Sequence, residues 1–282
     1  MNDIQIDIVV PTMNSSITLD WTLIGLSKIE TPRVSTNVYI IDSGSTDGTQ
    51  AIADKYGFNV HYYPKGNMYK AINYGLGLGK SPWCSYLNSD DIIYSDEFAE
   101  YVKYAEKEMI DIAYGNIDFI DGDGRFLHSW NSPSDGKLDK LFKNKLNPIP
   151  QVGTIFRRDV YKKLRGFDEK YKYVADYDFF YRALISGVRY RKYCYKTIAA
   201  FRIHENQFTQ VKQVQMDDEI TEVRKNMEVG GFLKINIYEF MYFKWRNVLN
   251  YLVRIIRNYQ LNGSLEIIKS TSINKKLDVN CK

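Results

Sequence analysis

Short apolar runs alternate with helix-like stretches over the first third of the chain. The runs predict four strands, at Ile6–Val10, Val38–Ile41, Asn59–Tyr63 and Trp83–Leu87. The stretches between them predict three helices: from a Ser15 or Ser16 cap to about Leu26, from Thr49 to Tyr56 with Asp47 as the cap, and from Tyr69 to Leu78. Because strands alternate with helices, we expect right-handed βαβ units and a parallel sheet.

The pattern is less regular in the second half of the chain. Strands are predicted at Asp111–Phe119 and Phe126–Trp130, around an Asp121–Gly124 turn, whereas residues 131–150 hold three of the seven prolines and read mostly as loop. The remaining predicted elements are a strand at Thr154–Phe156, helices at Asp159–Leu164 and Asp176–Ile185, two strands near 188–203, and helical, basic sequence from about 212. We therefore expect an α/β domain at residues 1–210 and a helical extension at residues 211–282.

Composition excludes several classes of protein. The 282 residues are 44% hydrophobic and 26% charged, which is typical of a folded chain, and a net charge of +4 is too small to indicate a nucleic-acid-binding protein. Cys84, Cys194 and Cys281 form no C-x-x-C pair, and the three histidines lack the spacing of a zinc site. No window approaches 18 apolar residues and no signal peptide is recognisable, so the expected location is cytoplasmic.

Polar clusters follow three of the predicted strands, at Pro11–Asn14, Asp42 and Asn88–Asp91. Ligands of an open parallel sheet bind at the carboxyl ends of its strands, so we expect these clusters to share a site. Asp42 would accept hydrogen bonds from a base or a ribose, or would instead be a turn or capping residue. The adjacent carboxylates Asp90 and Asp91 repel each other and favour a cation such as Mg²⁺ or Mn²⁺, or would instead cap a helix that begins near Ser95.

Two further motifs also have alternative readings. Gly75–Ser81 is similar to a phosphate-binding loop, but Tyr74 stands where that loop needs its first glycine, so we interpret the glycines as the end of a helix. Asp176 opens a predicted helix. It could take a proton from a hydroxyl nucleophile, or it could cap the helix.

In this order and spacing, the segments resemble the family 2 glycosyltransferases, which have the GT-A fold. The resemblance extends over roughly residues 4–208. It is carried by Ile8–Asn14, Ile41–Thr49, Lys70–Gly75, Leu87–Asp91, Gly166–Glu169 and Ala175–Asp178. The fold class that it implies is α/β GT-A, a Rossmann-like and mostly parallel sheet flanked by helices, with the helical extension at the C-terminus.

The resemblance also implies a nucleotide-binding site and a metal site. The implied nucleotide-binding residues are Pro11, Thr12, Asn14, Asp42, Gly66, Lys70, Asn73 and Asp90. Asp42 would contact the base, which is uracil in many family members. The implied ligands of Mn²⁺ or Mg²⁺ are Asp90, Asp91 and His204, since Asn88 replaces the first acid of the family's Asp-x-Asp motif.

The resemblance makes Asp176 the catalytic base. Ala175 occupies a position where an acidic residue is common in the family, and Asp178 is the reserve for the base. A single base that deprotonates the acceptor hydroxyl, opposite a metal-neutralised diphosphate leaving group, would invert the anomeric carbon. Trp130, Gln151 and Tyr177 are the candidate acceptor-binding residues, with packing or loop structure as the alternative.

The implied reaction moves a sugar from a nucleotide-sugar donor, most commonly a UDP-sugar, to a hydroxyl of a glycan or lipid-linked acceptor. Its setting would be the synthesis of cell-surface polysaccharide or lipopolysaccharide. One alternative is a sugar nucleotidyltransferase, but that needs a basic, glycine-rich loop after the first strand, and Thr12–Ser16 contains no Gly, Lys or Arg. The other is a non-catalytic, nucleotide-binding GT-A module, against which the four acidic residues Asp42, Asp90, Asp91 and Asp176 argue.

The C-terminal extension has its own chemistry. Lys234–Arg257 holds five basic residues and one acidic residue in an aromatic, amphipathic helical pattern. Such a helix can lie in a membrane interface and reach lipid-linked acceptors, or can pack on the catalytic domain or on a partner subunit. The protein would then lie in the cytoplasm or at the inner face of the membrane. The sequence is compatible with an oligomer as well as with a monomer.

Overall fold

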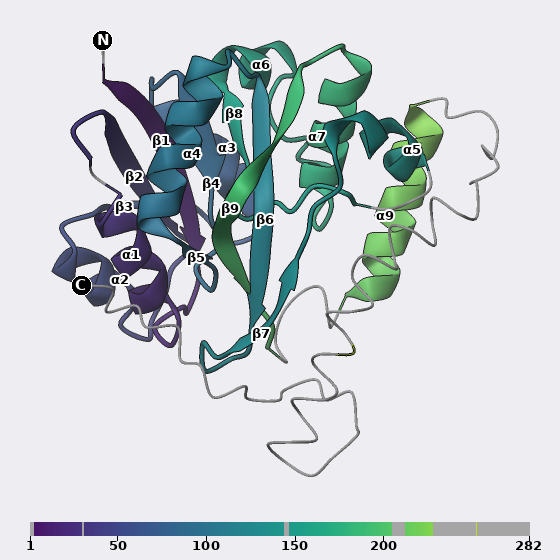
Figure 1. Ribbon diagram of the computed structural model, residues 1–282. Helices are drawn as coiled ribbons and strands as arrows, with labels where there is room; N and C mark the ends of the chain where they lie inside the picture. Colours follow the sequence, from purple (N-terminus) through teal and green to yellow (C-terminus); the bar gives the residue numbers. More distant parts are fainter. Residues whose placement is uncertain (1–2, 30, 144–146, 205–211, 228–251, 253–282) are drawn as a thin grey trace.

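The computed structural model describes residues 3–29, 31–143, 147–204, 212–227 and 252 (Figure 1). Within these residues one mixed sheet forms the centre of the molecule, in the order β3-β2-β1-β4-β8-β6-β9-β5, and β7 pairs with β6. Its strands are β1 (Ile4–Thr12), β2 (Val34–Asp42), β3 (Asn59–Tyr62), β4 (Trp83–Tyr86), β5 (Ile92–Ile93), β6 (Ile112–Ile120), β7 (Phe126–Trp130), β8 (Ile155–Arg157) and β9 (Tyr190–Arg202).

The first half of the sheet is parallel, as the apolar runs predict. β1 pairs in parallel with both β2 and β4, and β2 pairs in parallel with β3. The connecting helices are α1 (Leu19–Ser27), α2 (Thr49–Lys55) and α3 (Met68–Leu78). The register places Thr12 beside Asp42 and Asp42 beside Tyr62, so the polar residues after these strands meet at one edge of the sheet.

The predicted caps of the first two helices differ in outcome. The expectation of a Ser15 or Ser16 cap on α1 is wrong, because the cap residue is Thr18 and the Ser15 hydroxyl bonds to the Ser89 hydroxyl instead. Asp47 is not the cap residue of α2 either, since that residue is Gly48, but its side chain accepts the amide of Thr49, the first residue of the helix, over 3.1 Å. The side chains of Ser15 and Asp47 therefore hold the loops at the edge of the sheet, and Asp47 also contacts the first residue of α2.

The second half of the sheet is mixed. β8 is antiparallel to β4 and β6, whereas β9 is parallel to β6 and antiparallel to the short β5. The expectation of two strands near 188–203 is wrong, because β9 is continuous. Its exposed middle, Cys194–Lys196, looks like a break in the apolar pattern, and irregular pairing with β6 at this level lets the strand continue.

The described part of residues 131–150 holds more regular structure than predicted. They include a 3₁₀ turn at Asp135–Lys137 and helix α5 (Leu138–Lys143), which buries Leu138 and Phe142. The remaining helices are α4 (Ser95–Lys107), α6 (Arg158–Lys163), α7 (Ala175–Ile185) and α9 (Gln213–Asn226). In Figure 1, α9 lies beside α5 and α7 at the edge of the molecule, and its Val223 is fully buried.

The glycine-rich segment after residue 74 is the end of a helix, as interpreted from the sequence. α3 ends at Leu78, and Gly79 is its cap residue. A Cβ atom on Gly75 would lie 2.8 Å from the side chains of Val9 and Ile41, so this glycine lets α3 pack closely on the sheet. The glycines of this segment therefore let α3 pack on the sheet and end, and the segment is not a phosphate-binding loop.

A buried ion pair joins three elements beneath the sheet edge. Arg158 Nη2 lies 2.6 Å from Asp7 Oδ2, and both side chains are almost completely enclosed. The same guanidinium donates to the carbonyl oxygens of Ser81 and Leu76, and the Asp7 carboxylate also accepts from Ser81 and Asn37. The pair thus connects β1, the end of α3 and the start of α6.

The predicted membrane-interface segment, Lys234–Arg257, lies outside the described residues except for Leu252. Among the helices that the structure describes, none is both long and apolar enough to cross a membrane.

Candidate active site

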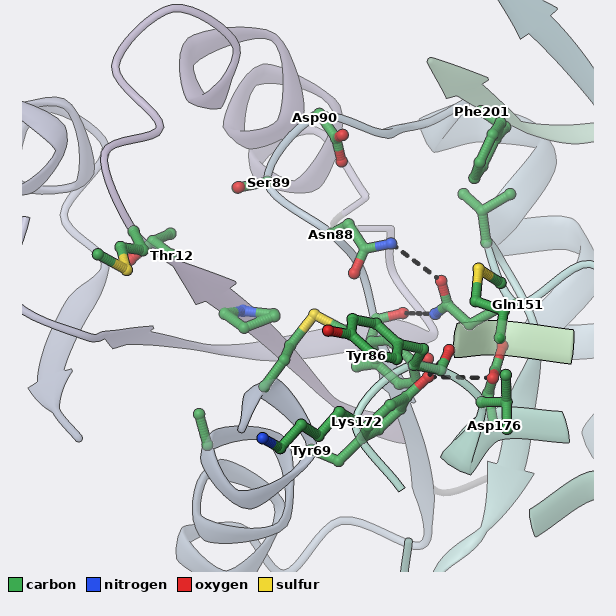
Figure 2. Close-up of a pocket in the computed structure, with 18 of the residues that line it drawn as sticks. Thr12, Tyr69, Tyr86, Asn88, Ser89, Asp90, Gln151, Lys172, Asp176 and Phe201 are labelled. Carbon is green, nitrogen blue, oxygen red and sulfur yellow. Dashed lines mark hydrogen bonds between the residues drawn. The ribbon is translucent and has the colours of Figure 1, made fainter. Parts of the chain in front are cut away.

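A pocket of about 820 Å³ opens at the carboxyl ends of β1 and β4 (Figure 2). The structure brings together in its lining these residues predicted from the sequence: Pro11, Thr12, Asn14, Gly66, Asp90, Trp130, Gln151, Asp176, Tyr177 and His204. Four other predicted residues do not line it: Asp42, Lys70, Asn73 and Asp91. Each of these four has another structural position, described below.

The loops after β1 and β2 hold each other at the end of the pocket where nucleotide binding is predicted, hereafter the nucleotide end. Asn14 takes a left-handed backbone conformation, with φ of 51°. Its amide donates to the Ser45 hydroxyl over 2.8 Å, and its side-chain oxygen accepts from the Thr46 amide over 2.9 Å. The Ser15 hydroxyl lies 2.8 Å from that of Ser89 and so connects both loops to the segment after β4. This end of the pocket is therefore preorganised by hydrogen bonds.

Asp42 organises the loop that follows it. The buried carboxylate accepts hydrogen bonds from the hydroxyls of Thr12 and Ser45, the amides of Gly44 and Ser45, and the side chain of Gln50. Burial acts to raise the pKa of Asp42, but these donors outweigh it and hold the pKa below its usual value. The turn interpretation of Asp42 thus fits this geometry, and direct contact with a base stays a prediction.

Asp90 and His204 form the acidic and imidazole pair of the pocket. His204 Nε2 lies 2.9 Å from Asp90 Oδ2, and both side chains are partly exposed. Arg202, at the end of β9, donates from Nε to the main-chain oxygen of Asp90 over 2.8 Å. β9 therefore carries His204 to the segment after β4, a contact that spans 114 residues of sequence.

Asp91 points into the protein instead of the pocket. Its carboxylate accepts from the Arg202 amide over 3.0 Å and from the Asn88 side chain over 3.3 Å, and it is fully buried. Burial, and then the neighbouring Asp90, raises its pKa well above the usual value. A direct contact between Asp91 and a metal ion would require it to exchange these partners, so its assignment as a metal ligand stays a prediction.

The residues at the pocket surface fit a divalent metal ion that shares its coordination with substrate. Mg²⁺ and similar ions commonly take one or two carboxylates together with substrate phosphates and water. Asp90 and His204 supply one carboxylate and one imidazole. Throughout the part of the chain that the structure describes, no three His, Cys, Asp or Glu side chains gather into a metal centre. The other ligands would then come from a donor diphosphate and water.

Gln151 and Asn88 hold each other across the middle of the pocket (Figure 2). The Gln151 amide donates to the carbonyl of Tyr86 over 2.7 Å, and its oxygen lies 3.5 Å from the Asn88 nitrogen. Asn88 Oδ1 is buried without a hydrogen-bond partner among the described residues. Gln151 therefore orients the segment after β4 and lines the pocket, and its contact with an acceptor stays a prediction.

Asp176 is the carboxylate at the opposite wall of the pocket. It stands in the first turn of α7, half-buried, and accepts a hydrogen bond from the Tyr69 hydroxyl over 3.0 Å. Burial raises the pKa of Asp176, so it is a stronger base than an exposed aspartate. The reserve residue Asp178 is instead paired with Arg182, at 2.6 Å, and does not line the pocket.

Asn73, in the Lys70–Gly75 segment, has a structural role and does not line the pocket. Its nitrogen donates to the carbonyl of Phe167, and its oxygen accepts from the Tyr161 hydroxyl and the Phe167 amide. It thereby fastens α3 to the Gly166–Glu169 turn. Lys70 is exposed on the same helix.

Sequence reasoning missed several lining residues. Lys65 and Lys172 bring positive charge, Tyr69 bonds to Asp176, and Met216 and Ile220 reach the pocket from α9. The lysines carry no motif, but Lys172 stands four residues before Asp176, which is the one signal that could have indicated it. The α9 residues lie in the predicted extension and are brought to the pocket only by packing.

The pocket wall away from the nucleotide end is largely apolar. It is made by side chains of β6, β7, β9, α9 and the segment before β8: Ile117, Phe119, Trp130, Ile149, Val152, Phe201, Met216 and Ile220. Tyr177 belongs to this packing as well, since its hydroxyl donates to the carbonyl of Phe142 and its side chain is buried. Apolar walls with a few placed polar groups are typical of small-molecule sites.

The fold and pocket place the chain among α/β proteins that bind a ligand at the carboxyl ends of parallel strands. The profile of glycosyl transferase family 2 matches residues 7–165, which is more than half of the chain. The chain therefore belongs to glycosyl transferase family 2.

Known proteins agree with this membership. An uncharacterized glycosyltransferase of Rickettsia typhi is 27% identical over 197 residues, which are 64% of this chain and 59% of that protein, so the match spans less than two thirds of that relative. A PGL/p-HBAD biosynthesis glycosyltransferase of Mycobacterium bovis is 24% identical over 252 residues, 86% of this chain and 91% of that protein.

A solved structure identifies the fold. Glucosyl-3-phosphoglycerate synthase from Mycobacterium tuberculosis, in complex with Mn²⁺, uridine diphosphate and glucosyl-3-phosphoglycerate, matches with a TM-score of 0.56 at 17% identity, over 78% of each chain. The fold of this protein is accordingly GT-A, as the motifs imply.

Proposed function

We propose that this protein is an inverting, metal-dependent glycosyltransferase that moves a sugar from a nucleotide-sugar donor, in the first instance a UDP-sugar, to a hydroxyl group. The observation that carries the proposal is the pairing of two polar walls across one pocket. The Asp90–His204 pair lies on one wall and the Asp176–Tyr69 pair on the other. Figure 2 shows Asp90 on the side of the pocket opposite Tyr69 and Asp176. Sugar transfer needs one group of residues to bind the donor diphosphate and a separate base for the acceptor hydroxyl, and the two walls can supply these.

The residues on the Asp176 wall perform the proton transfer. The Asp176 carboxylate accepts the proton of the acceptor hydroxyl as that oxygen attacks the anomeric carbon. The Tyr69 hydroxyl donates to Asp176 Oδ1 and so orients the carboxylate toward the pocket. Since attack comes from the face opposite the leaving diphosphate, the anomeric configuration inverts, and the Asp176 wall needs no covalent sugar intermediate.

The residues at the nucleotide end hold the donor. Thr12, Asn14 and Gly66 line the pocket beside the joined loops, and Lys65 and Lys172 bring positive charge to the diphosphate. A bound Mn²⁺ or Mg²⁺, held by Asp90 and His204, would neutralise charge on the leaving diphosphate. The solved relative with Mn²⁺ and uridine diphosphate supports a UDP donor and a divalent metal ion here.

The apolar wall supports an acceptor that carries an apolar part, such as a lipid-linked glycan. Trp130 lines the pocket, and an aromatic ring is suited to packing against sugar or lipid. We propose a role in the synthesis of cell-surface polysaccharide or lipopolysaccharide, with Lys234–Arg257 providing peripheral contact with the membrane.

Binding of UDP and Mn²⁺ is the first test. At a concentration about a hundred times its Kd, UDP is expected to stabilise the folded protein by about 2.7 kcal/mol. For a chain of this size that is about 5 to 10 °C in Tm. UDP with Mn²⁺ should raise Tm more than UDP or Mn²⁺ alone, and Asp90→Ala should remove most of this extra increase. Thermal unfolding with a panel of nucleotides measures both effects.

Asp54→Ala is the matched control, because Asp54 is exposed on α2 and away from the pocket. It should keep the full increase with UDP and Mn²⁺. No increase in the wild-type protein with any nucleoside diphosphate would refute the proposed donor. An increase that Asp90→Ala leaves intact would refute the metal site at Asp90. A metal-dependent increase in Tm with guanosine or thymidine diphosphate, but not with UDP, would refute a UDP-sugar as donor and leave the proposed reaction in place.

A further inference from the structure

Helix α9 is part of the pocket although it follows the family match by almost fifty residues. Met216 and Ile220 line the pocket, and Val223 is buried between α9 and the rest of the protein. Arg224, at the end of the same helix, donates to the carbonyl of Lys143 at the end of α5. The helix is thus fixed to the catalytic domain at several points.

Glu219 of α9 receives three consecutive main-chain amides. One carboxylate oxygen accepts from the Lys172 amide over 3.0 Å, and the other accepts from Tyr173 over 2.9 Å and from Val174 over 3.2 Å. The segment Lys172–Val174, hereafter the strap, leads directly into α7. Hydrogen bonds to a carboxylate are about twice as strong as neutral ones, so one side chain determines the path of the strap.

The strap carries one wall of the pocket. All three of its residues line the pocket, and Figure 2 shows Lys172 on the side across from Ser89 and Asp90. Asp176 follows the strap after one intervening residue. Tyr69, whose hydroxyl donates to Asp176, also lies 3.4 Å from the main-chain oxygen of Tyr173. A shift of the strap therefore moves both the carboxylate and the phenol that orients it.

We infer that Glu219 is a positioning residue of the active site, which acts by holding the strap and, through it, the Asp176 carboxylate. The inference rests on the proposed function of Asp176 as the base. It makes the first helix of the C-terminal extension a component of the catalytic site.

Hydrogen exchange tests the contact itself without reference to activity. Glu219→Gln keeps the size of the side chain but removes the charge and turns one acceptor into a donor. Exchange of the amides of Lys172, Tyr173 and Val174 is expected to become at least about tenfold faster in this variant, which corresponds to about 1.4 kcal/mol. Amides in the middle of β1 should keep their wild-type rates. Unchanged exchange in the strap would overturn the inference.

Donor turnover tests the consequence. With the UDP-sugar that gives the highest rate, in Mn²⁺, Glu219→Gln is expected to lower kcat by about ten- to a hundredfold, because small misplacement of a reacting group is this costly. The Kd of UDP should change less than about threefold, since the flexible Lys172 side chain can follow the diphosphate. A structural role alone would lower Tm without separating kcat from UDP binding.

Asp218→Asn is the matched control. It also replaces a carboxylate by an amide, and Asp218 is exposed on the same helix. It should resemble the wild-type protein in exchange, kcat and Kd. If Glu219→Gln also retains wild-type kcat while Asp176→Asn is inactive, the positioning role is wrong and the proposed base stands. If Asp176→Asn is as active as wild type, the proposed base fails, and exchange in the strap still reports on the contact.

Discussion

Asp176→Asn is expected to lower kcat for sugar transfer by about 10² to 10⁴-fold, the usual contribution of a general base. The amide occupies the same volume and can still accept the Tyr69 hydroxyl, but it cannot take up a proton. The Kd of UDP should stay near the wild-type value, because Asp176 is not among the residues proposed to hold the nucleotide. Steady-state rates with a UDP-sugar and Mn²⁺, together with UDP binding, measure the two quantities.

The pH dependence of the wild-type rate is expected to report on the same carboxylate. Burial raises the pKa of Asp176, and only the deprotonated form is a base, so kcat/KM should fall as the pH drops through this raised pKa. The titratable groups that face Asp176 are Tyr69 from α3, Tyr86 from β4 and Asp178 on its own helix. Burial raises the pKa values of both phenols well above the usual value, so they stay neutral over this range.

Tyr69→Phe gives a signed test of this assignment. The Tyr69 hydrogen bond acts to lower the pKa of Asp176, partly offsetting the effect of burial. Without the hydroxyl, the carboxylate should hold its proton to higher pH, and the acidic limb of the kcat/KM profile should move upward. A limb that moves downward, or does not move, would mean that another group controls it.

Asp178→Asn is the control for Asp176→Asn, since both are aspartates in the first turn of α7. Asp178 is paired with Arg182 and lies away from the pocket, so this change should reduce stability and leave kcat near the wild-type value. The charge of Asp178 acts to raise the pKa of Asp176, so the acidic limb of the profile should move downward, opposite to its movement in Tyr69→Phe. If Asp178→Asn abolished transfer and Asp176→Asn did not, the assignment of the base would be reversed.

Local patterns predict the parallel half of this protein well, because each strand and helix of its βαβ units shows its own apolar pattern within a short stretch of sequence. The apolar runs locate β1 to β4 within a few residues, and the polar ends of these strands do meet at the pocket. The errors arise where distant contacts override local signals. Cys194–Lys196 interrupts the apolar pattern of β9, yet pairing with β6 keeps the strand continuous.

Motifs identify the region of the site better than the orientation of its side chains. Asp90 and Asp91 are adjacent, and only the three-dimensional structure shows that one faces His204 while the other faces Arg202. Asp42 and Asn73 likewise stand in motif segments, but their side chains form hydrogen bonds with loop residues. Glu219 has no motif at all, because its partners are main-chain amides 45 to 47 residues earlier in the chain.

Arg158→Ala is expected to cost about 3 to 5 kcal/mol of unfolding free energy, since it leaves the buried Asp7 carboxylate without its counter-charge. For a domain of this size, that corresponds to a decrease in Tm of about 6 to 20 °C. The loss should exceed that of an ordinary ion pair because the guanidinium also satisfies the carbonyl oxygens of Ser81 and Leu76. Thermal and urea unfolding measure it.

Two variants separate charge from packing in this prediction. Lys55→Ala removes an exposed ion pair with Asp20 and should leave the free energy of unfolding close to the wild-type value. The double variant Asp7→Leu with Arg158→Met replaces both charges by apolar groups, and it should recover part of the stability lost in Arg158→Ala, since burying an ion pair is itself expensive. If Arg158→Ala were no more destabilising than Lys55→Ala, the Asp7–Arg158 pair would not be what holds β1, α3 and α6 together.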